Sequence, residues 1–239
     1  MRGFVIFSLL VILISSPIFA DDYRVYRPDN FSTNQIEEDE RVLFILDFSN
    51  SMQEYLDGRR KVDLMVETMK AILPKLSPNV SVGLRVYGHR MGFTPMEACH
   101  ASSLISPITL GNGYNISNSL NKLKPRGMTP ITYSLKQAVK NDFLGFRGKK
   151  HIILLTDGGE NCDESPCKYV MELIKIRKDV KIDVIAFNID DEDDLAQLEC
   201  TSMVTCGKFY NAQTASQLVN SLNNSVNSYK KVEAKIIPN

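Results

Sequence analysis

The sequence has no excess of either charge. Its 239 residues include 28 Lys and Arg against 28 Asp and Glu. Proteins that bind nucleic acid usually carry a basic stripe, so this balance argues against a nucleic-acid partner. The sequence also lacks the phosphate-binding patterns G-x-x-x-x-G-K-[ST] and G-x-G-x-x-G, and the G-x-S-x-G pattern of serine hydrolases. Functional information must therefore come from other local motifs.

Cysteine is too sparse for a small disulfide-stapled scaffold, since the chain has only five. A hydrophobic content of 44% also excludes a disordered chain. Length and composition are those of one globular domain with a short appendage. We expect an N-terminal arm or linker over residues 21–40, the domain over 41–233 and a C-terminal tail over 234–239.

Residues 1–20 are predicted to be a secretory signal. Arg2 supplies a positive charge, a largely apolar run extends from Phe4 to Ile14, and the segment ends in the small residue Ala20. This order is typical of a signal cleaved after Ala20. The run is short of the roughly 20 apolar residues that cross a bilayer, so an uncleaved anchor is the less favoured alternative. We therefore expect an exported protein, periplasmic or extracellular, with no membrane span after cleavage.

In an exported protein, cysteines are expected to form disulfides. Two bridges and one free thiol are the simplest arrangement. Short loops favour the pairs Cys162–Cys167 and Cys200–Cys206, with Cys99 as a competitor, because spacing alone does not fix connectivity. A zinc site at Cys99, His100, Cys162 and Cys167 is the weaker alternative, since no paired C-x₂-C spacing is present.

Short apolar runs alternate with amphipathic segments along the domain. Continuous apolar runs predict strands buried on both faces at 42–46, 152–155 and 184–187. Further strands are predicted at 81–87, 104–110 and 209–210, and helices at 62–76, 116–123, 130–139, 169–176, 195–198 and 214–233. The last helix has a thin apolar stripe and is expected to pack weakly. This alternation predicts a doubly wound, mostly parallel, six-stranded α/β sheet with one antiparallel edge strand.

Two local signals refine this prediction. Pro107 cannot donate a ladder hydrogen bond, which places its strand at a sheet edge. Thr129 is expected to cap a helix that begins at Pro130.

Oxygen-bearing side chains are expected to meet at one edge of the sheet. Asp47 and Asp157 follow the first two buried strands, and right-handed crossovers place the loops after these strands on one rim. The candidate ligands are Asp47, Ser49, Ser51, Thr129 and Asp157. Taken singly, each could satisfy its own turn or cap. Together they predict an all-oxygen site for Mg²⁺ (or Mn²⁺).

These elements resemble the metal-ion-dependent adhesion site of von Willebrand factor A domains, which would make the fold Rossmann-like. The matching features are D-x-S-x-S from Asp47, a Thr after a Gly, and the T-D-G turn, in that order. The resemblance implies that Ser49, Ser51 and Thr129 contact the ion, with Asp47 and Asp157 acting mainly through water. The family usually has Gly between the two serines. Asn stands there in this chain, and Asn tolerates left-handed backbone angles well.

A narrower resemblance points to exported bacterial A domains. It rests on the run from Gly83 to Arg90, on Thr129-Pro-Ile, and on Cys162 and Cys167 after the T-D-G turn. The resemblance implies an exported adhesion-type module that binds a partner's Asp or Glu carboxylate through the metal, and not an enzyme.

Three alternatives compete with this interpretation. A metal-independent structural domain of an envelope assembly is the main one. A haloacid-dehalogenase-like hydrolase would resemble this chain at Asp47 but needs a second Asp where Ser49 stands. The acidic segment 188–199 imitates a calcium loop, but Asp193 occupies the position that requires Gly. Its acids are expected to cap the following helix.

Overall fold

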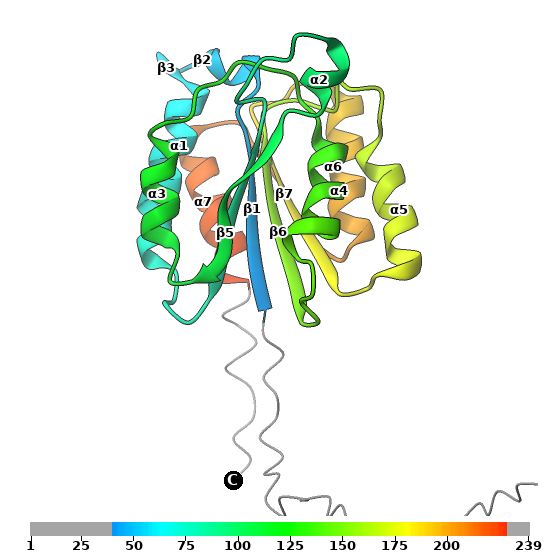
Figure 1. Ribbon diagram of the computed structural model, residues 1–239. Helices are drawn as coiled ribbons and strands as arrows, with labels where there is room; N and C mark the ends of the chain where they lie inside the picture. Colours follow the sequence, from blue (N-terminus) through cyan, green and yellow to red (C-terminus); the bar gives the residue numbers. More distant parts are fainter. Residues whose placement is uncertain (1–39, 229–239) are drawn as a thin grey trace, which may run out of the picture. The chain divides into compact units, whose positions relative to one another are not determined.

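The computed structural model describes residues 40–228 (Figure 1). The predicted signal, most of the predicted arm and the predicted tail lie outside the described residues. Within residues 40–228, no helix has the length and apolar character needed to cross a membrane.

A six-stranded sheet in the order β5-β4-β1-β6-β7-β8 forms the centre of the domain. Its strands are β1 (Glu40–Asp47), β4 (Ser81–Tyr87), β5 (Ser102–Leu110), β6 (Lys149–Thr156), β7 (Val180–Phe187) and β8 (Phe209–Ala212). All pairings are parallel except that of β5 with β4. The predicted sheet is therefore confirmed, including the antiparallel strand that carries Pro107 at the edge.

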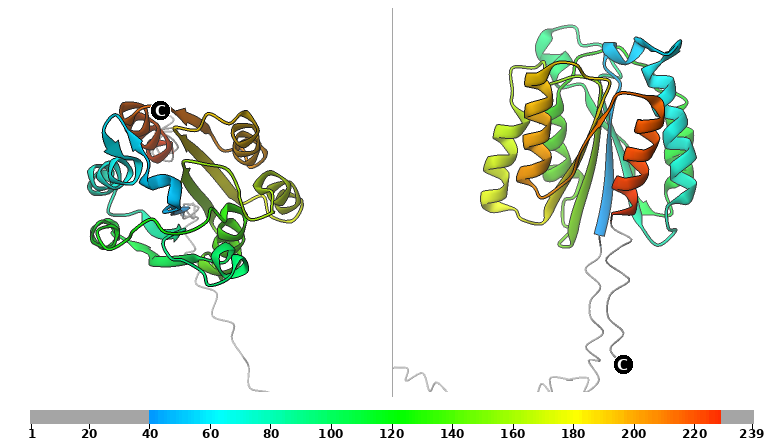
Figure 2. Two further views of the ribbon diagram at one scale, coloured as in Figure 1. Left: turned by 90° about the horizontal axis from the view of Figure 1, so that it is seen from above. Right: turned by 180° about the vertical axis from the view of Figure 1, so that it is seen from behind.

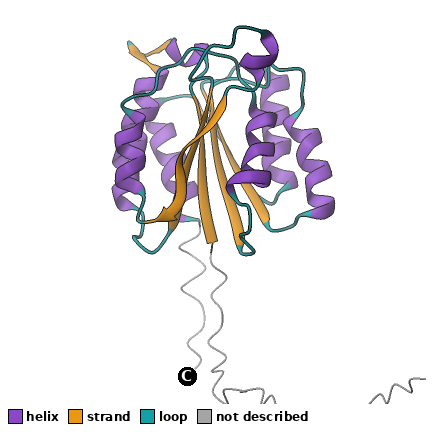
Figure 3. Cartoon of the chain, in the orientation of Figure 1, coloured by secondary structure: helices purple, strands orange, loops and turns teal. Residues whose placement is uncertain are grey.

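Helices cover both faces of the sheet (Figures 2 and 3). One face carries α1 (Lys61–Ile72), α3 (Gly113–Leu120) and α7 (Ala215–Asn227), and the other carries α4 (Ile131–Gln137), α5 (Pro166–Ile176) and α6 (Glu192–Val204). The short elements are α2 (Pro95–Cys99), the hairpin of β2 (Tyr55–Leu56) and β3 (Arg59–Arg60), the 3₁₀ turns Asn50–Gln53 and Leu73–Lys75, and a π-type turn, Ala138–Asp142. Neither α2 nor the hairpin was predicted.

The position of β1 inside the sheet explains why its sequence is continuously apolar. Phe44 and Leu46 pack into the core beneath α1 and α7, whereas Leu43 and Ile45 pack into the core beneath α4 to α6. All four side chains are fully buried. Burial of such a side chain contributes about 1.5–3 kcal/mol, which fixes the strand end where the candidate site begins.

The start of α4 differs from the prediction. The helix begins at Ile131, with Pro130 in a non-helical conformation before it and no side-chain cap. Thr129 does not cap the helix. Its own N–H donates to the side chain of Asn161 at 2.7 Å, while its carbonyl accepts from the N–H of Ile131. A residue distant in the sequence therefore determines how this loop enters the helix.

The expectation that α7 packs weakly is also wrong. Leu218 and Leu222 are fully buried, and the helix begins with a capping box between Thr214 and Gln217. Its last turn is held by a buried hydrogen bond, 2.7 Å long, from the Ser225 hydroxyl to a carboxylate oxygen of Asp183. Ser221 and Ser225 are also buried, and their small side chains let this helix approach the sheet. The thin apolar stripe is therefore accompanied by close packing.

Candidate metal-binding site

Two carboxylates stand at neighbouring strand ends. Asp47 is the last residue of β1, and Asp157 follows the last residue of β6, which is the strand beside β1. Ser51 bridges to the second of them, because its hydroxyl donates to Asp157 Oδ1 at 2.6 Å. The Ser51 hydroxyl lies 2.9 Å from that of Ser49. Serine hydroxyls and carboxylates thus form one connected group on the rim of the sheet.

Asp47 is the buried anchor of this group. Its Oδ1 accepts the N–H of Ser49 at 2.6 Å, which fixes the turn after β1. Its Oδ2 accepts hydroxyls from Tyr87 at 3.1 Å and Thr156 at 2.8 Å. Both oxygens are therefore hydrogen-bonded within the protein, and Asp47 is held rigidly under the two serines.

The loop that carries Thr129 packs directly against the D-x-S-x-S loop. The N–H of Asn50 donates to the Gly127 carbonyl at 3.0 Å, and the N–H of Gly127 donates to the Gly88 carbonyl at 2.7 Å. Gly88 has a φ of +68°, and a Cβ there would lie 2.5 Å from the Ser49 nitrogen, so no larger residue fits. Thr129 follows two residues after Gly127 and is buried.

Asn50 replaces the usual glycine without backbone strain. It opens the 3₁₀ turn after β1 and is absent from the residues with positive φ within 40–228. The flexibility expected of Asn at this position is therefore not needed.

The two carboxylates are buried and repel each other. Burial, and then the charge of Asp157, raise the pKa of Asp47 to about 7, despite its hydrogen bonds to Ser49 and Thr156. Burial also raises the pKa of Asp157, against the opposing effects of Ser51 and Lys61. A positive charge placed beside this pair would lower both pKa values and relieve the repulsion.

One cation, Lys61, already lies near the pair. This buried side chain places Nζ 3.2 Å from Asp157 Oδ2 and 2.9 Å from an oxygen of Glu54. The contact with Asp157 is electrostatic, because Oδ2 is buried and receives no directed hydrogen bond in the described structure. In the described structure the charge of Lys61 is therefore the main partner of this Asp157 oxygen.

Lys61, Tyr87 and Thr156 were not predicted as parts of the site. Two of them stand at the ends of predicted strands, which is a signal that could have found them. Tyr87 is paired in register with Asp47, and Thr156 immediately precedes Asp157. Lys61 carries no such signal, because a lysine at the start of an amphipathic helix usually faces solvent.

The disulfides differ from the predicted short-range pairs. The structure joins Cys99 to Cys162 and Cys167 to Cys200, and leaves Cys206 as an exposed free thiol. The predictions Cys162–Cys167 and Cys200–Cys206 are therefore wrong. The reason is helix packing: Cys167 lies in the first turn of α5, where its Cα is 5.4 Å from that of Cys200 on α6.

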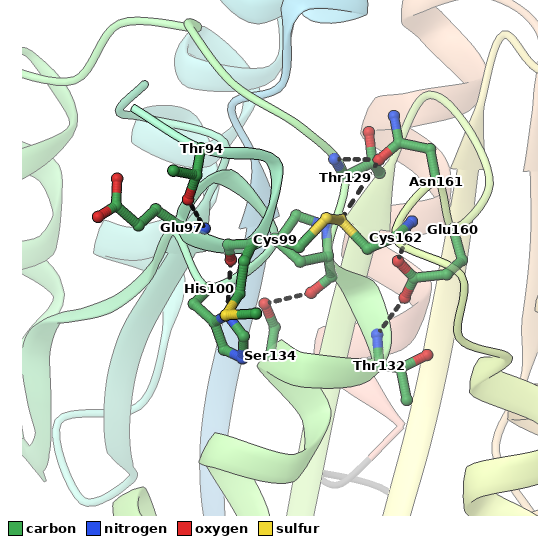
Figure 4. The surroundings of a disulfide bond; sticks show 12 residues. Thr94, Glu97, Cys99, His100, Thr129, Thr132, Ser134, Glu160, Asn161 and Cys162 are labelled. Carbon is green, nitrogen blue, oxygen red and sulfur yellow. Dashed lines mark hydrogen bonds between the residues drawn. A yellow bond between two sulfur atoms is a disulfide. The ribbon is translucent and has the colours of Figure 1, made fainter. Parts of the chain in front are cut away.

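The Cys99–Cys162 disulfide supports the loop that meets Thr129 (Figure 4). Next to Cys162, Asn161 accepts the N–H of Thr129 at 2.7 Å. Glu160 accepts the N–H of Thr132 at 2.7 Å and that of Cys162 at 3.0 Å. The bond therefore ties α2 to the loop after β6, and this loop holds the segment that enters α4.

This connectivity predicts a thiol count. Protein denatured without reductant should react with alkylating agent at one cysteine, Cys206, because the other four are in disulfides. Mass spectrometry after alkylation checks the number. The Cys206→Ser variant should take up no label, and labelling of Cys99 or Cys162 in unreduced protein would contradict the pairing.

The acidic segment after β7 caps a helix, as predicted. Asp191 Oδ1 accepts the N–H of Asp194 at 2.9 Å at the start of α6. Asp194 in turn accepts the N–H of Gly159 at 3.0 Å, so it also holds the loop after β6.

Within residues 40–228, no group of three or more His, Cys, Asp or Glu side chains is placed to hold a metal. The candidate site has two carboxylates and depends on hydroxyls for the rest of its oxygen donors.

Comparisons with known proteins agree on the family. The profile of the von Willebrand factor type A domain matches residues 42–225. Two uncharacterized proteins of Bacillus subtilis (strain 168) are similar over much of their lengths. YwmD is 28% identical over 218 residues, covering 89% of this chain and 90% of its own. YwmC is 30% identical over 177 residues, covering 72% and 77%.

Solved structures share the fold. Proximal thread matrix protein 1 of the mussel byssus, in a form with a zinc-occupied MIDAS motif, superposes with a TM-score of 0.60 at 20% identity, over 78% of this chain and 44% of that one. The pilus adhesin SpaC of Lactobacillus rhamnosus GG, in its open conformation, gives 0.61 at 16% identity, over 81% and 30%. This chain spans less than half of either solved chain.

The match to the family profile covers most of this chain and shows that the chain belongs to the von Willebrand factor type A domain family.

Proposed function

We propose that this protein is an exported, non-enzymatic interaction module that binds a partner's Asp or Glu carboxylate through Mg²⁺ or Mn²⁺. The residues that would hold the ion are Asp47, Ser49, Ser51, Thr129 and Asp157. One observation carries the proposal: two buried, mutually repelling carboxylates lie under a pair of serine hydroxyls at the rim. Such a group gains stability from a cation and offers it the oxygen ligands that hard divalent ions prefer.

The carboxylates and the hydroxyls would have different roles in such a site. Asp47 cannot easily turn outward, because the turn and two hydroxyls hold both its oxygens. It therefore orients the serines and contributes negative charge from below. Ser49 and Ser51 present neutral oxygens, which leave the positive charge of an ion largely uncompensated. A bound ion would supply an electrophilic position to which a partner carboxylate could bind.

Export is supported by the two disulfides, since such bonds persist in oxidising compartments. The interaction role is supported by the family and by the pilus adhesin that shares the fold.

One contact favours a second function, a metal-independent structural domain of an envelope assembly. Lys61 already lies 3.2 Å from Asp157 and supplies part of the positive charge that an ion would bring. If this contact is sufficient, the domain needs no metal and its partners bind elsewhere.

Retention of envelope proteins on the immobilised domain distinguishes the two functions. We expect retention in Mg²⁺ and its loss in EDTA, because the ion makes the bond to the partner. Ser51→Ala should reduce the affinity about 10- to 100-fold, as is usual for damage around a metal site. Ser119→Ala removes an exposed hydroxyl bonded to its own helix and should behave as wild type. Equal retention in Mg²⁺ and EDTA would support the structural domain instead.

A further inference from the structure

A groove starts beside the candidate metal site and runs along α1. Asn50 and Gln53, from the turn after β1, line one end, and Lys70 and Asn121 line the other. Its volume is about 940 Å³. One wall is α1 and the other is the segment 120–126, so we call it the α1 groove. A partner carboxylate at the metal site would lie at the mouth of this groove.

The α1 groove is locally basic in a chain without net charge. Five basic side chains line it, against two acidic ones. Both acids are already paired within the protein: Asp63 lies 2.8 Å from Arg60, and Glu67 lies 2.5 Å from Arg59. Lys70 contacts the amide oxygen of Asn121, which carries no charge. The remaining positive charges, Lys124 and Arg126, are exposed and form no ion pair within residues 40–228.

Arg126 is placed directly beside the candidate metal site. Its N–H donates to the carbonyls of Phe48 at 3.2 Å and Gly88 at 2.9 Å, so its backbone belongs to the packed loops of the site. The next residue, Gly127, is bridged to Ser49. These backbone hydrogen bonds thus hold Arg126, which lines the α1 groove, next to the loop after β1.

Exposed apolar side chains also line the α1 groove. Tyr55, in the hairpin, is 71% exposed, and Met91, in the loop after β4, is 75% exposed. Exposed aromatic and methionine side chains are typical anchors of protein interfaces, since they bury large areas on binding. Basic and exposed apolar side chains therefore line the same groove beside the candidate metal site.

We propose that the α1 groove binds an extended acidic segment of the partner protein, which also supplies the metal-bound carboxylate. This inference rests on the proposed function and adds the chemistry of the partner. One acidic residue reaches the metal, a neighbouring apolar residue packs against Tyr55 or Met91, and further acidic residues meet Arg126 and Lys124. We favour a peptide over an anionic glycan, because only a peptide combines carboxylates with an apolar side chain that can bury Tyr55 or Met91.

Two synthetic peptides of equal length test the inference by fluorescence anisotropy in saturating Mg²⁺. Both peptides contain one glutamate beside a phenylalanine. In the first peptide several aspartates follow, and in the second each of these aspartates is replaced by asparagine. We expect the aspartate peptide to bind roughly three- to tenfold more tightly, as a few exposed charge pairs would produce. This difference should shrink at high ionic strength. The double variant Arg126→Gln/Lys124→Gln should abolish it.

A matched variant controls for net charge. Lys168 and Lys178 are exposed at the start and just after the end of α5, a helix on the opposite face of the sheet. The double variant Lys168→Gln/Lys178→Gln removes the same charge and should leave the difference unchanged. The inference is wrong if the two peptides bind wild type equally, or if a sulfated oligosaccharide binds the groove more tightly than the aspartate peptide. Equal, EDTA-sensitive binding of both peptides would still support the proposed function, whereas no binding of either peptide would count against both.

Discussion

Mg²⁺ should raise the melting temperature of the domain by about 5–10 °C at pH 8 and by much less at pH 5. A ligand present at about a hundred times its dissociation constant, bound only to the folded state, stabilises by about 2.7 kcal/mol. For a domain of this size, 1 kcal/mol corresponds to about 2–4 °C. The increment should be largest at the higher pH, where the ion replaces no proton.

The pH dependence follows from Asp47. Its pKa in the folded domain is about 7, above the usual 3.8, because the carboxyl is buried beside Asp157. A raised pKa means that the metal-free folded state binds the proton more tightly than the unfolded chain does. The stability from that proton is fully present below pH 3.8 and is lost as the pH rises through about 7. Mg²⁺ competes with the proton for the same charge, so it binds best after the proton has left.

Thermal unfolding at the two pH values, in Mg²⁺ and in EDTA, checks this expectation. Asp157→Asn should remove the increment, because one of the two charges that attract the ion is gone. Asp63→Asn changes an exposed acid on α1 and should keep the increment. An equal increment at pH 5 and pH 8, or an undiminished one in Asp157→Asn, would contradict the assigned site.

Asp183→Ala should lower the free energy of unfolding by about 3–5 kcal/mol, the usual cost of breaking a buried charged group. This carboxylate is fully buried on β7, where Oδ1 accepts the N–H of Lys208 at 2.9 Å. Its Oδ2 accepts the Ser225 hydroxyl at 2.7 Å and lies 3.1 Å from His151 Nε2. The substitution removes this partner from the buried Ser225 hydroxyl and from buried His151, and releases the last turn of α7.

The pKa of Asp183 supports this view. Burial alone would raise it, but the contacts with His151, Ser225 and the Lys208 N–H outweigh burial and lower the pKa to about 2. A lowered pKa means that the contribution to stability is present above pH 3.8 and is lost as the pH falls through about 2.

Urea denaturation at neutral pH measures the effect. Ser225→Ala should cost about 1.5–3 kcal/mol, because it removes one hydrogen bond to a charged group. Asp190→Ala removes an exposed acid after the same strand and should change stability by less than about 0.5 kcal/mol. A loss below about 1 kcal/mol in Asp183→Ala would show that the buried carboxylate does not hold α7 to the sheet.

The parts of the fold that the sequence predicts are those determined by local burial. Residues 42–46 are apolar at every position because helices cover both faces of β1. The same pattern identifies the strand ends, and Asp47 and Asp157 could be singled out because they stand there. Metal binding by these residues stays a prediction.

What the sequence did not predict depends on contacts between distant segments. Cys167 meets Cys200 only because α5 and α6 pack side by side. Thr129 does not cap α4, which begins at Ile131, and its N–H donates instead to Asn161, 32 residues away. Lys61 joins the site because α1 starts at the rim and its side chain turns inward. Periodicity records which face of an element is buried, but not which residue of another element it meets.

The orientation of β1 also determines how the domain would carry mechanical load. The candidate site sits at the carboxyl end of this strand, while the amino end of β1 and the end of α7 lie together at the opposite pole (Figures 1 and 2). Tension between a bound partner and the chain that precedes Glu40 would therefore run along the strand axis. Strand β1 is hydrogen-bonded on both sides, to β4 and β6. Such tension would shear both ladders at once, without separating their hydrogen bonds one by one, and β1 would then be the strand that bears it.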